Sequence, residues 1–299
     1  MRGRPGTFLP GRIIYAIGIR GGLRFLGSRR FVRLMYHCRN GTWLNLDDPA
    51  TFNEKLQWLK LHDKNPLCPI WVDKYAAKQY VADCVGEEYV IPTYGVWDGF
   101  DDIDFSALPE TFVLKCTHDC GGVCICRGKD SWDMHAAKRM ITASLKRNYY
   151  WVGREWPYRD VPPRILAEKY LGTGENQEES LTDYKVHVFS GVPKVILVCT
   201  DRFSAHGMNE DFYDCEWNHL DIRRKRYPNR KDFIPKPEHL GEMISVAAKL
   251  AGDVPFVRVD FYETGGRLMF GEMTLYPASG FETFLPEEAD QMLGSLLSL

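Results

Sequence analysis

The sequence predicts an α+β fold built on antiparallel sheets. Three pairs of short apolar or alternating segments are each separated by glycine, which is typical of strands joined in hairpins. Between these pairs, residues 137–144 and 243–250 carry apolar side chains at helical spacing. Strand pairs with interposed helices indicate an α+β architecture.

The elements can be placed in order along the chain. Residues 66–69 have a proline at each end and are expected to form a linker into a helix over residues 73–85. Residues 201–236 are polar, aromatic and basic, which predicts either a long loop that covers a site or ordinary irregular surface. The expected strands lie at residues 91–97, 111–115, 123–126, 165–171, 184–189, 195–200 (after a turn at Gly191), 257–262 and 268–274.

The last strand pair places two carboxylates, and the length of its turn decides how they meet. A two-residue turn at Gly265 and Gly266 puts Asp260 and Glu272 on opposite faces, whereas a three-residue turn with a glycine bulge pairs them on one face. We expect the second arrangement, which also brings Arg258 opposite Thr274. Facing carboxylates need a positive charge between them, and hard oxygen ligands of this kind suit Mg²⁺ bound with a nucleotide.

An ordinary hairpin with both acids in water is the alternative. Apolar neighbours favour a ribbon that is buried on at least one side, and a charged face inside a large protein indicates function. These neighbours are Val257, Val259, Phe261, Met269 and Phe270.

Charge is balanced overall but uneven along the chain. The net charge of −2 argues against wholesale nucleic-acid binding. Residues 1–33 hold eight arginines and no acid, interleaved with isoleucine, leucine and phenylalanine. Two interpretations stay open for this basic segment: peripheral contact with an anionic membrane face, or a helix that docks on the enzyme and shows its arginines to water. The absence of a signal-peptide pattern and of a ~20-residue apolar run predicts a cytoplasmic protein.

The nine cysteines are odd in number and scattered, which predicts reduced thiols. One group, comprising Cys116, His118, Cys120, Cys124 and Cys126, is dense enough to suggest zinc. Its spacing matches no familiar pair of zinc ligands, and Cys124 and Cys126 alternate along an expected strand. A structural role is therefore favoured over a metal site.

Lys115 ends an expected strand and is followed by Gly121 and Gly122 in a short hairpin loop. Backbone N–H groups of such a loop can approach phosphate oxygens while the ammonium neutralises them. The pattern also occurs in plain turns, so a phosphate role depends on other evidence.

The order of several motifs supplies that evidence. The stretches VDKYAAKQYVADCVGEEYVIPTY, FVLKCTHDCGG, ILAEKYL with DYKVHVF, FVRVDFY and GEMTLYPASG resemble the ATP-grasp superfamily over residues 71–280. The stretch TFNEKLQWLKLHDKNP, together with TFVLKCTHDCGG and FVRVDFY, is similar to the TupA-like ATP-grasp family of polysaccharide-biosynthesis proteins. This resemblance implies two α+β lobes with antiparallel sheets that clasp a nucleotide, plus a basic helical extension.

The resemblance assigns roles residue by residue. Lys74 and Lys115 match the phosphate-binding lysines, with Gly121 and Gly122 in the glycine loop; Glu168, Lys169 and Leu171 match the adenine-binding hinge; Asp183 falls where a ribose-binding acid is usual; Arg258 matches an arginine that steadies the transferred phosphate; and Asp260 and Glu272 match the metal-bridging pair. Thr274 departs from the usual Asn and offers a weaker metal ligand. Lys185 has no general counterpart and serves either the acceptor or the surface.

The family implies ATP and Mg²⁺, and an ATP-dependent carboxylate–amine ligase that forms an amide through an acyl phosphate. The acceptor implied is a glycan or sugar carboxylate, such as a uronic acid of a cell-surface polysaccharide, and the nucleophile is an amino acid or other amine. Residues 147–159 (RNYYWVGREWPYR) suit sugar stacking with Arg154 or Arg159 as carboxylate ligands, or equally the edge of a core.

Other functions use the same residues. A glycan kinase would need no amine, a metal-dependent glycosyltransferase would need a nucleotide sugar in place of ATP, and a binding module would leave the charged groups without a role. We expect a basic extension over residues 1–50, an N-terminal subdomain over residues 51–110 and an ATP-grasp domain over residues 111–299.

Overall fold

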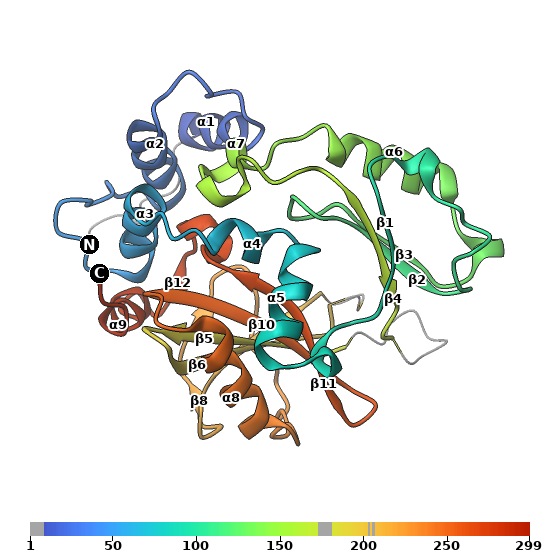
Figure 1. Cartoon of the computed structure of the whole chain (residues 1–299). Coiled ribbons are helices and arrows are strands. Elements are labelled where there is room, and N and C mark those ends of the chain that lie inside the picture. Colours follow the sequence, from blue (N-terminus) through green and yellow to red (C-terminus); the bar gives the residue numbers. More distant parts are fainter. Residues whose placement is uncertain (1–8, 173–180, 203, 205–206) are drawn as a thin grey trace.

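The computed structural model describes residues 9–172, 181–202, 204 and 207–299. Two antiparallel sheets dominate the fold, and Figure 1 shows them in two lobes with helices around them. The smaller sheet has the strand order β1-β4-β2-β3, and the larger sheet has the order β11-β10-β5-β6-β7-β8. The predicted α+β class with antiparallel sheets is confirmed.

The smaller sheet and one helix form the first lobe. Helix α6 (Met134–Leu145) packs on β2 and β3 and closes an apolar core with Phe112, Leu114 and Ile141. The opposite face of the sheet carries Lys115 and Glu168 toward the second lobe. The strands are β1 (Thr93–Trp97), β2 (Phe112–Cys116), β3 (Val123–Cys126) and β4 (Ile165–Lys169).

The larger sheet shows the same division between its faces. Helix α8 (Leu240–Ala251) packs against β5, β6 and β10, where Val257, Val259 and Phe261 are fully buried. Alternate residues of the same strands point into the space between the lobes. The strands are β5 (Asp183–Phe189), β6 (Val192–Thr200), β7 (Asn209–Asp214), β8 (His219–Leu220), β10 (Phe256–Thr264) and β11 (Arg267–Thr274).

Shorter elements surround the two sheets. Helix α3 starts with a capping box, in which Thr51 accepts from the Glu54 amide and Glu54 accepts from the Thr51 amide. The remaining helices are α1 (Leu9–Ile19), α2 (Ser28–Asn40), α3 (Phe52–His62), α4 (Cys68–Val72), α5 (Ala76–Val85), α7 (Tyr150–Gly153) and α9 (Ala289–Ser295), with 3₁₀ turns at Glu87–Tyr89, Phe100–Asp102, Lys129–Ser131, Trp156–Tyr158 and Pro277–Gly280. A two-stranded sheet pairs β9 (Arg223–Arg224) with β12 (Phe284–Leu285).

Three sequence predictions need correction. The expected linker at residues 66–69 runs into α4, because proline is tolerated in the first turn of a helix. The helix expected from residue 73 begins at Ala76, since Asp73 accepts hydrogen bonds from the amides of Tyr75 and Ala76. The third correction concerns residues 201–236, for which either a long loop over a site or irregular surface was expected.

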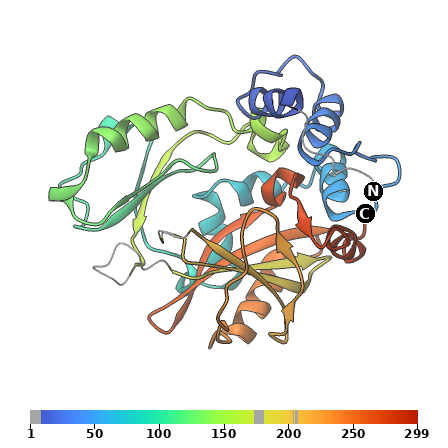
Figure 2. The same ribbon diagram turned by 180° about the vertical axis from the view of Figure 1, so that it is seen from behind.

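That segment contains β7, β8 and β9. Strand β7 pairs with β6 from Val195 to Thr200 and so extends the larger sheet. Figure 2 views the molecule from behind, where the yellow to orange segment that holds these strands faces the viewer. The predicted loop is wrong for this stretch because β7 is almost wholly buried and carries an acid at two of its inner positions, which hides the alternation expected of a strand.

The hairpin of β10 and β11 confirms the pairing of Asp260 with Glu272 and of Arg258 with Thr274. The expected reason was wrong. The turn has two residues, with Gly265 and Gly266 at φ 57° and 67°, as a tight hairpin requires. Phe261 pairs with Phe270, so the extra residue of a bulge is Gly271, and it lies beside the carboxylates instead of in the turn.

The division of the chain at residues 50 and 110 stays a prediction. Strand β1, from the middle segment, pairs with β4 of the smaller sheet. Among the helices that the structure describes, none has the length and apolar character that crossing a bilayer takes.

Candidate active site

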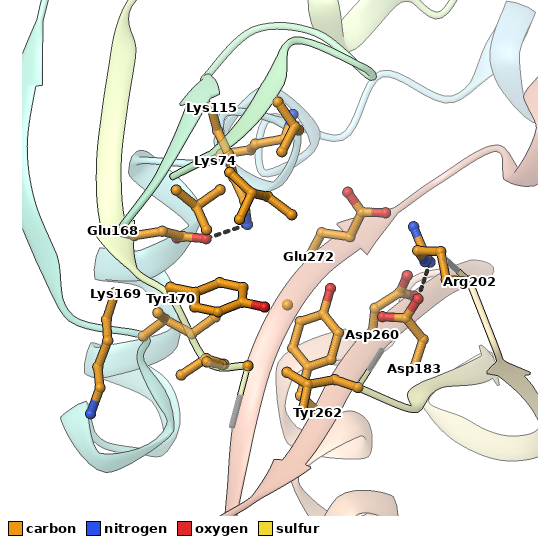
Figure 3. A pocket seen from close by; sticks show the side chains of 18 of the residues that line it. Lys74, Lys115, Glu168, Lys169, Tyr170, Asp183, Arg202, Asp260, Tyr262 and Glu272 are labelled. Carbon is orange, nitrogen blue, oxygen red and sulfur yellow. Dashed lines mark hydrogen bonds and ion pairs between the residues drawn. The ribbon is translucent and has the colours of Figure 1, made fainter. Parts of the chain in front are cut away.

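A cavity of about 350 Å³ lies between the inner faces of the two sheets. Residues that lie almost 200 positions apart in the sequence form its walls. Figure 3 shows acids and bases that point into the cavity from both lobes. The predicted residues that line it are Lys74, Lys115, Gly121, Glu168, Lys169, Leu171, Asp183, Lys185, Asp260 and Glu272. Its volume is in the range typical of small-molecule sites.

The larger sheet contributes a network of carboxylates and cations. Arg258 donates to both oxygens of Asp260, at 2.6 and 2.7 Å, and the same guanidinium reaches Glu272 Oε1 at 3.3 Å. It also donates to Thr274 Oγ1 at 3.0 Å. One arginine thus bridges the two acids, in the place where the sequence analysis required a positive charge.

Lys185 lies on the neighbouring strand β5 and forms an ion pair with Asp260. It is buried, so a surface role for this lysine is wrong. Burial by itself would raise the pKa of Asp260, but Arg258 and Lys185 outweigh it and lower that pKa to about 2. Asp260 therefore stays ionised at any physiological pH.

The smaller sheet contributes the opposite arrangement, one acid between two bases. Glu168 forms ion pairs with Lys78, at 2.8 Å, and with Lys115. Burial opposes its ionisation, yet the two lysines hold the pKa of Glu168 below its usual value. Lys115 therefore lines the cavity while it is ion-paired with Glu168 of the hinge strand β4.

The glycine loop between β2 and β3, residues 117–122, is anchored from below. The buried Asp119 accepts from the Gly122 amide at 3.3 Å and from the Ser144 hydroxyl of α6. Lys74 donates to the Asp119 carbonyl, which ties the first predicted phosphate lysine to this loop. Asp119 thus connects three parts of the predicted phosphate-binding region.

The two glycines of this loop differ in position. Gly121 has φ 121° and lines the cavity, and a side chain there would meet nothing within 4 Å. Gly122 does not line it: a Cβ atom there would lie 2.5 Å from Ser144 Oγ and 3.0 Å from Cys116. The first glycine leaves the backbone open to the cavity, and the second allows the loop to pack on α6.

The hinge and ribose residues lie around the remaining wall. Leu171 lines the cavity directly after β4, whereas Lys169 points away from the other labelled side chains in Figure 3. Asp183 is buried and forms an ion pair with Arg202, while Lys185 lies 3.8 Å from it. Asp183 is thus part of the same charged network as Asp260.

Several lining or supporting residues were missed by the sequence analysis. Lys78 lies on α5, four positions after Lys74, which itself precedes that helix, so helical spacing from Lys74 does not predict its place at the site. No motif in the sequence assigns a role to the others. They are Asp119, Tyr170, Arg202 and Tyr262.

The structure also bears on the possible zinc site at residues 116–126 and on the possible sugar-binding segment at residues 147–159. In the described part of the chain, no three histidine, cysteine or acidic side chains are grouped closely enough to hold a metal. Cys116, Cys124 and Cys126 are buried and belong to the apolar core beneath α6. Arg154 does not face the cavity; it is buried and donates to backbone carbonyls of Leu23, Arg24 and Leu26, so a role for it as a carboxylate ligand is wrong. Arg159 is exposed, and sugar stacking by the rest of residues 147–159 stays a prediction.

The residues present fit a magnesium ion bound together with a nucleotide. Asp260 and Glu272 supply hard oxygen donors on one face of the hairpin, and Thr274 adds a hydroxyl 3.5 Å from Glu272. Two carboxylates are too few to hold Mg²⁺ as a protein-only site, which leaves coordination positions for phosphate oxygens and water. The low pKa of Asp260 keeps one donor charged.

Comparisons with solved structures return ATP-grasp enzymes at low identity. D-alanine–D-alanine ligase from Bacillus anthracis complexed with ATP has 17% identity and a TM-score of 0.41, over 69% of this chain and 55% of that one. The ATP-grasp ligase PsnB, complexed with minimal precursor, Mg and ADP, has 10% identity and a TM-score of 0.39, over 74% and 57%. D-alanine–D-alanine ligase from Helicobacter pylori has 12% identity and a TM-score of 0.45, over 83% and 67%. The chain thus spans less than two thirds of the length of the first two.

None of the curated proteins compared with the chain matches it. The family model described as TupA-like ATPgrasp matches residues 54–298, which includes both sheets and every residue of the cavity wall. With its two α+β lobes around one charged cavity, the chain has the ATP-grasp fold and belongs to the TupA-like ATP-grasp family.

Proposed function

We propose that this protein is an ATP-dependent carboxylate–amine ligase that acts on a glycan. The observation that carries the proposal is the pair Asp260 and Glu272, bridged by Arg258 and placed across one cavity from Lys115. Paired acids on one wall, held by a buried arginine behind them, and lysines on the other wall suit a polyphosphate with a divalent ion between them. Membership in the ATP-grasp family supports ATP as that polyphosphate.

The nucleotide would contact both lobes. Lys74, Lys115 and the backbone at Gly121 would hold its phosphates, and the β4 hinge at Glu168, Lys169 and Leu171 would receive the adenine. Asp183 would contact the ribose. Asp260, Glu272 and Thr274 would hold Mg²⁺, which when bound neutralises charge on the phosphate oxygens.

The acceptor carboxylate is a poor electrophile until it is activated. One of its oxygens attacks the γ-phosphorus, the bond to the β–γ bridging oxygen breaks, and ADP leaves, so the carboxylate becomes an acyl phosphate. An amine then attacks the carbonyl carbon, inorganic phosphate leaves with the electron pair of the C–O bond, and the nitrogen loses a proton. Arg258 and the lysines stabilise charge on the transferred phosphoryl group and hold the reactants in place, so no protein nucleophile is needed.

The acceptor class that we propose is a uronic acid of a polysaccharide or its precursor. The nucleophile that we propose is an amino acid or another amine. The resemblance of the stretch TFNEKLQWLKLHDKNP, residues 51–66, to polysaccharide-biosynthesis proteins supports this acceptor class. We place the enzyme in the cytoplasm, where ATP is supplied. A kinase would use the same nucleotide site but transfer the phosphoryl group to a sugar hydroxyl.

Thermal-shift measurements with Mg²⁺ and ATP, ADP or UDP-glucuronate test the first step. We expect ATP and ADP to raise the melting temperature in a Mg²⁺-dependent way, and Glu272→Gln to lose the Mg²⁺-dependent part. A shift with UDP-glucuronate and none with ATP would indicate a glycosyltransferase and overturn the proposal. Mass spectrometry after incubation with ATP, a uronate oligosaccharide and an amino-acid mixture then separates an amide, which gains the mass of an amine less water, from a phosphate ester.

A further inference from the structure

We propose that helix α1 and the loop after it, residues 20–27, form a docking face for an anionic lipid bilayer. The face consists of Arg12, Ile13, Ile17, Arg20, Arg24 and Phe25, all exposed. The proposal does not depend on the ligase activity, because it concerns a surface outside the cavity wall.

The orientation of α1 separates the two interpretations that the sequence left open. A helix that merely docks on the enzyme buries its isoleucines and shows its arginines to water. Here the side of α1 that carries Gly18 packs against α2, because a Cβ atom on Gly18 would lie 2.3 Å from the Met35 sulfur. Ile13 and Ile17, one helical turn apart, remain 56% and 45% exposed. The fold therefore leaves outside the apolar side chains that docking would cover.

The loop that follows α1 is built to present its side chains. The buried Arg154 donates to the carbonyls of Leu23, Arg24 and Leu26, at 3.1, 3.3 and 3.0 Å. Phe25 lies in the middle of this clamped stretch and is 80% exposed. Figures 1 and 2 show the loop as the arch at the top of the molecule, between α1 and α2. A buried arginine thus fixes a protruding loop that carries an exposed aromatic ring.

Charge determines which surface would cover these residues. Arg12, Arg20 and Arg24 are exposed and interspersed with the apolar side chains along the chain, and residues 1–46 contain no acid. The first acid, Asp47, pairs with Arg29 of α2, outside the proposed face. Exposed apolar side chains interspersed with arginines match the boundary between acyl chains and anionic headgroups, where Phe25 and the isoleucines insert and the guanidinium groups meet phosphates. An apolar protein partner would not need the arginines, and a soluble polyanion would not need Phe25.

Flotation with vesicles tests the proposal. The full chain is mixed with vesicles of phosphatidylcholine and phosphatidylglycerol (1:1) or of phosphatidylcholine alone, and the fraction that floats is measured at low and high salt. We expect binding to the anionic vesicles only, weakened by salt. Phe25→Ser should reduce the partition coefficient by about tenfold through lost insertion, and Arg20→Gln by about fivefold through lost attraction.

A matched control is available on another part of the surface. Phe233 is 78% exposed, close to the value for Phe25, and lies far from residues 12–25 in sequence. Phe233→Ser should bind vesicles like the unchanged protein, and circular dichroism should show all variants folded. Absence of binding to the anionic vesicles would overturn the proposal. So would binding that Phe25→Ser and Ile13→Ser leave unchanged, because attraction of the arginines alone would then account for it.

Discussion

Asp260 and Glu272 should differ sharply in what they do for the fold, although both should be needed for Mg²⁺·ATP. The Asp260 side chain is 2% exposed and takes two hydrogen bonds from Arg258 and one from Lys185. Glu272 is 41% exposed and has one contact with Arg258, at 3.3 Å. The prediction concerns Asp260→Asn and Glu272→Gln, which remove the charges and keep the shapes.

Asp260→Asn leaves two buried cations without their main counter-charge. Breaking a buried ion pair by removing one partner costs about 3–5 kcal/mol, which lowers the melting temperature of a chain of this size by roughly 6–10 °C. Glu272→Gln removes a half-exposed contact and should change the free energy of unfolding by less than about 1 kcal/mol. The two variants therefore separate the stability effect from the ligand effect.

The assay is thermal unfolding with and without Mg²⁺·ATP. At about one hundred times its dissociation constant, ATP should stabilise the unchanged protein by roughly 2.7 kcal/mol, and both variants should lose most of this gain. Equal destabilisation by the two substitutions would refute the burial argument. A full Mg²⁺·ATP shift in Glu272→Gln would refute the metal assignment.

Three further outcomes are expected. Lys115→Met should weaken ATP binding, measured by calorimetry, by roughly tenfold or more from the loss of one charge-assisted contact, while stability changes little because Lys78 still pairs with Glu168. Burial lowers the pKa of Lys60 to about 7, against a weaker opposing effect of a neighbouring acid. Between pH 7 and pH 10 the unfolded chain therefore binds more protons than the folded protein. Urea unfolding should show that the protein gains stability relative to Lys60→Met as the pH rises through that window. Arg154→Met should release the loop at residues 20–27, seen as faster amide hydrogen exchange there.

Each of these outcomes has a control or a contradicting result. For the first, Lys138→Met removes an exposed ion pair with Asp101 and should leave ATP binding unchanged. A constant stability difference between the unchanged protein and Lys60→Met from pH 7 to pH 10 would rule out the lowered pKa. Unchanged exchange at residues 20–27 in the Arg154 variant would show that the clamp does not hold the loop.

Local patterns in the sequence were sufficient for the strands that carry the acids. The alternation along residues 257–262 and 268–274 predicted one buried and one charged face, and the structure pairs Asp260 with Glu272 as expected. Side-chain direction in a strand depends only on parity, which a sequence records directly. The position of the extra residue was not predictable in the same way. A bulge at Gly271 and a bulge in the turn give the same pairing, so parity cannot tell them apart.

The sequence by itself determined the α+β class, the hairpins and the order of the charged motifs, because periodicity and turn residues act over a few positions. Only the tertiary structure decided which partner each charge meets. Glu168 joins Lys78 to Lys115, and Arg154 holds a loop some 130 positions away instead of facing a sugar. Such contacts arise from the packing of distant segments, which minimises unpaired buried charge over the whole fold and leaves no periodic trace along the chain.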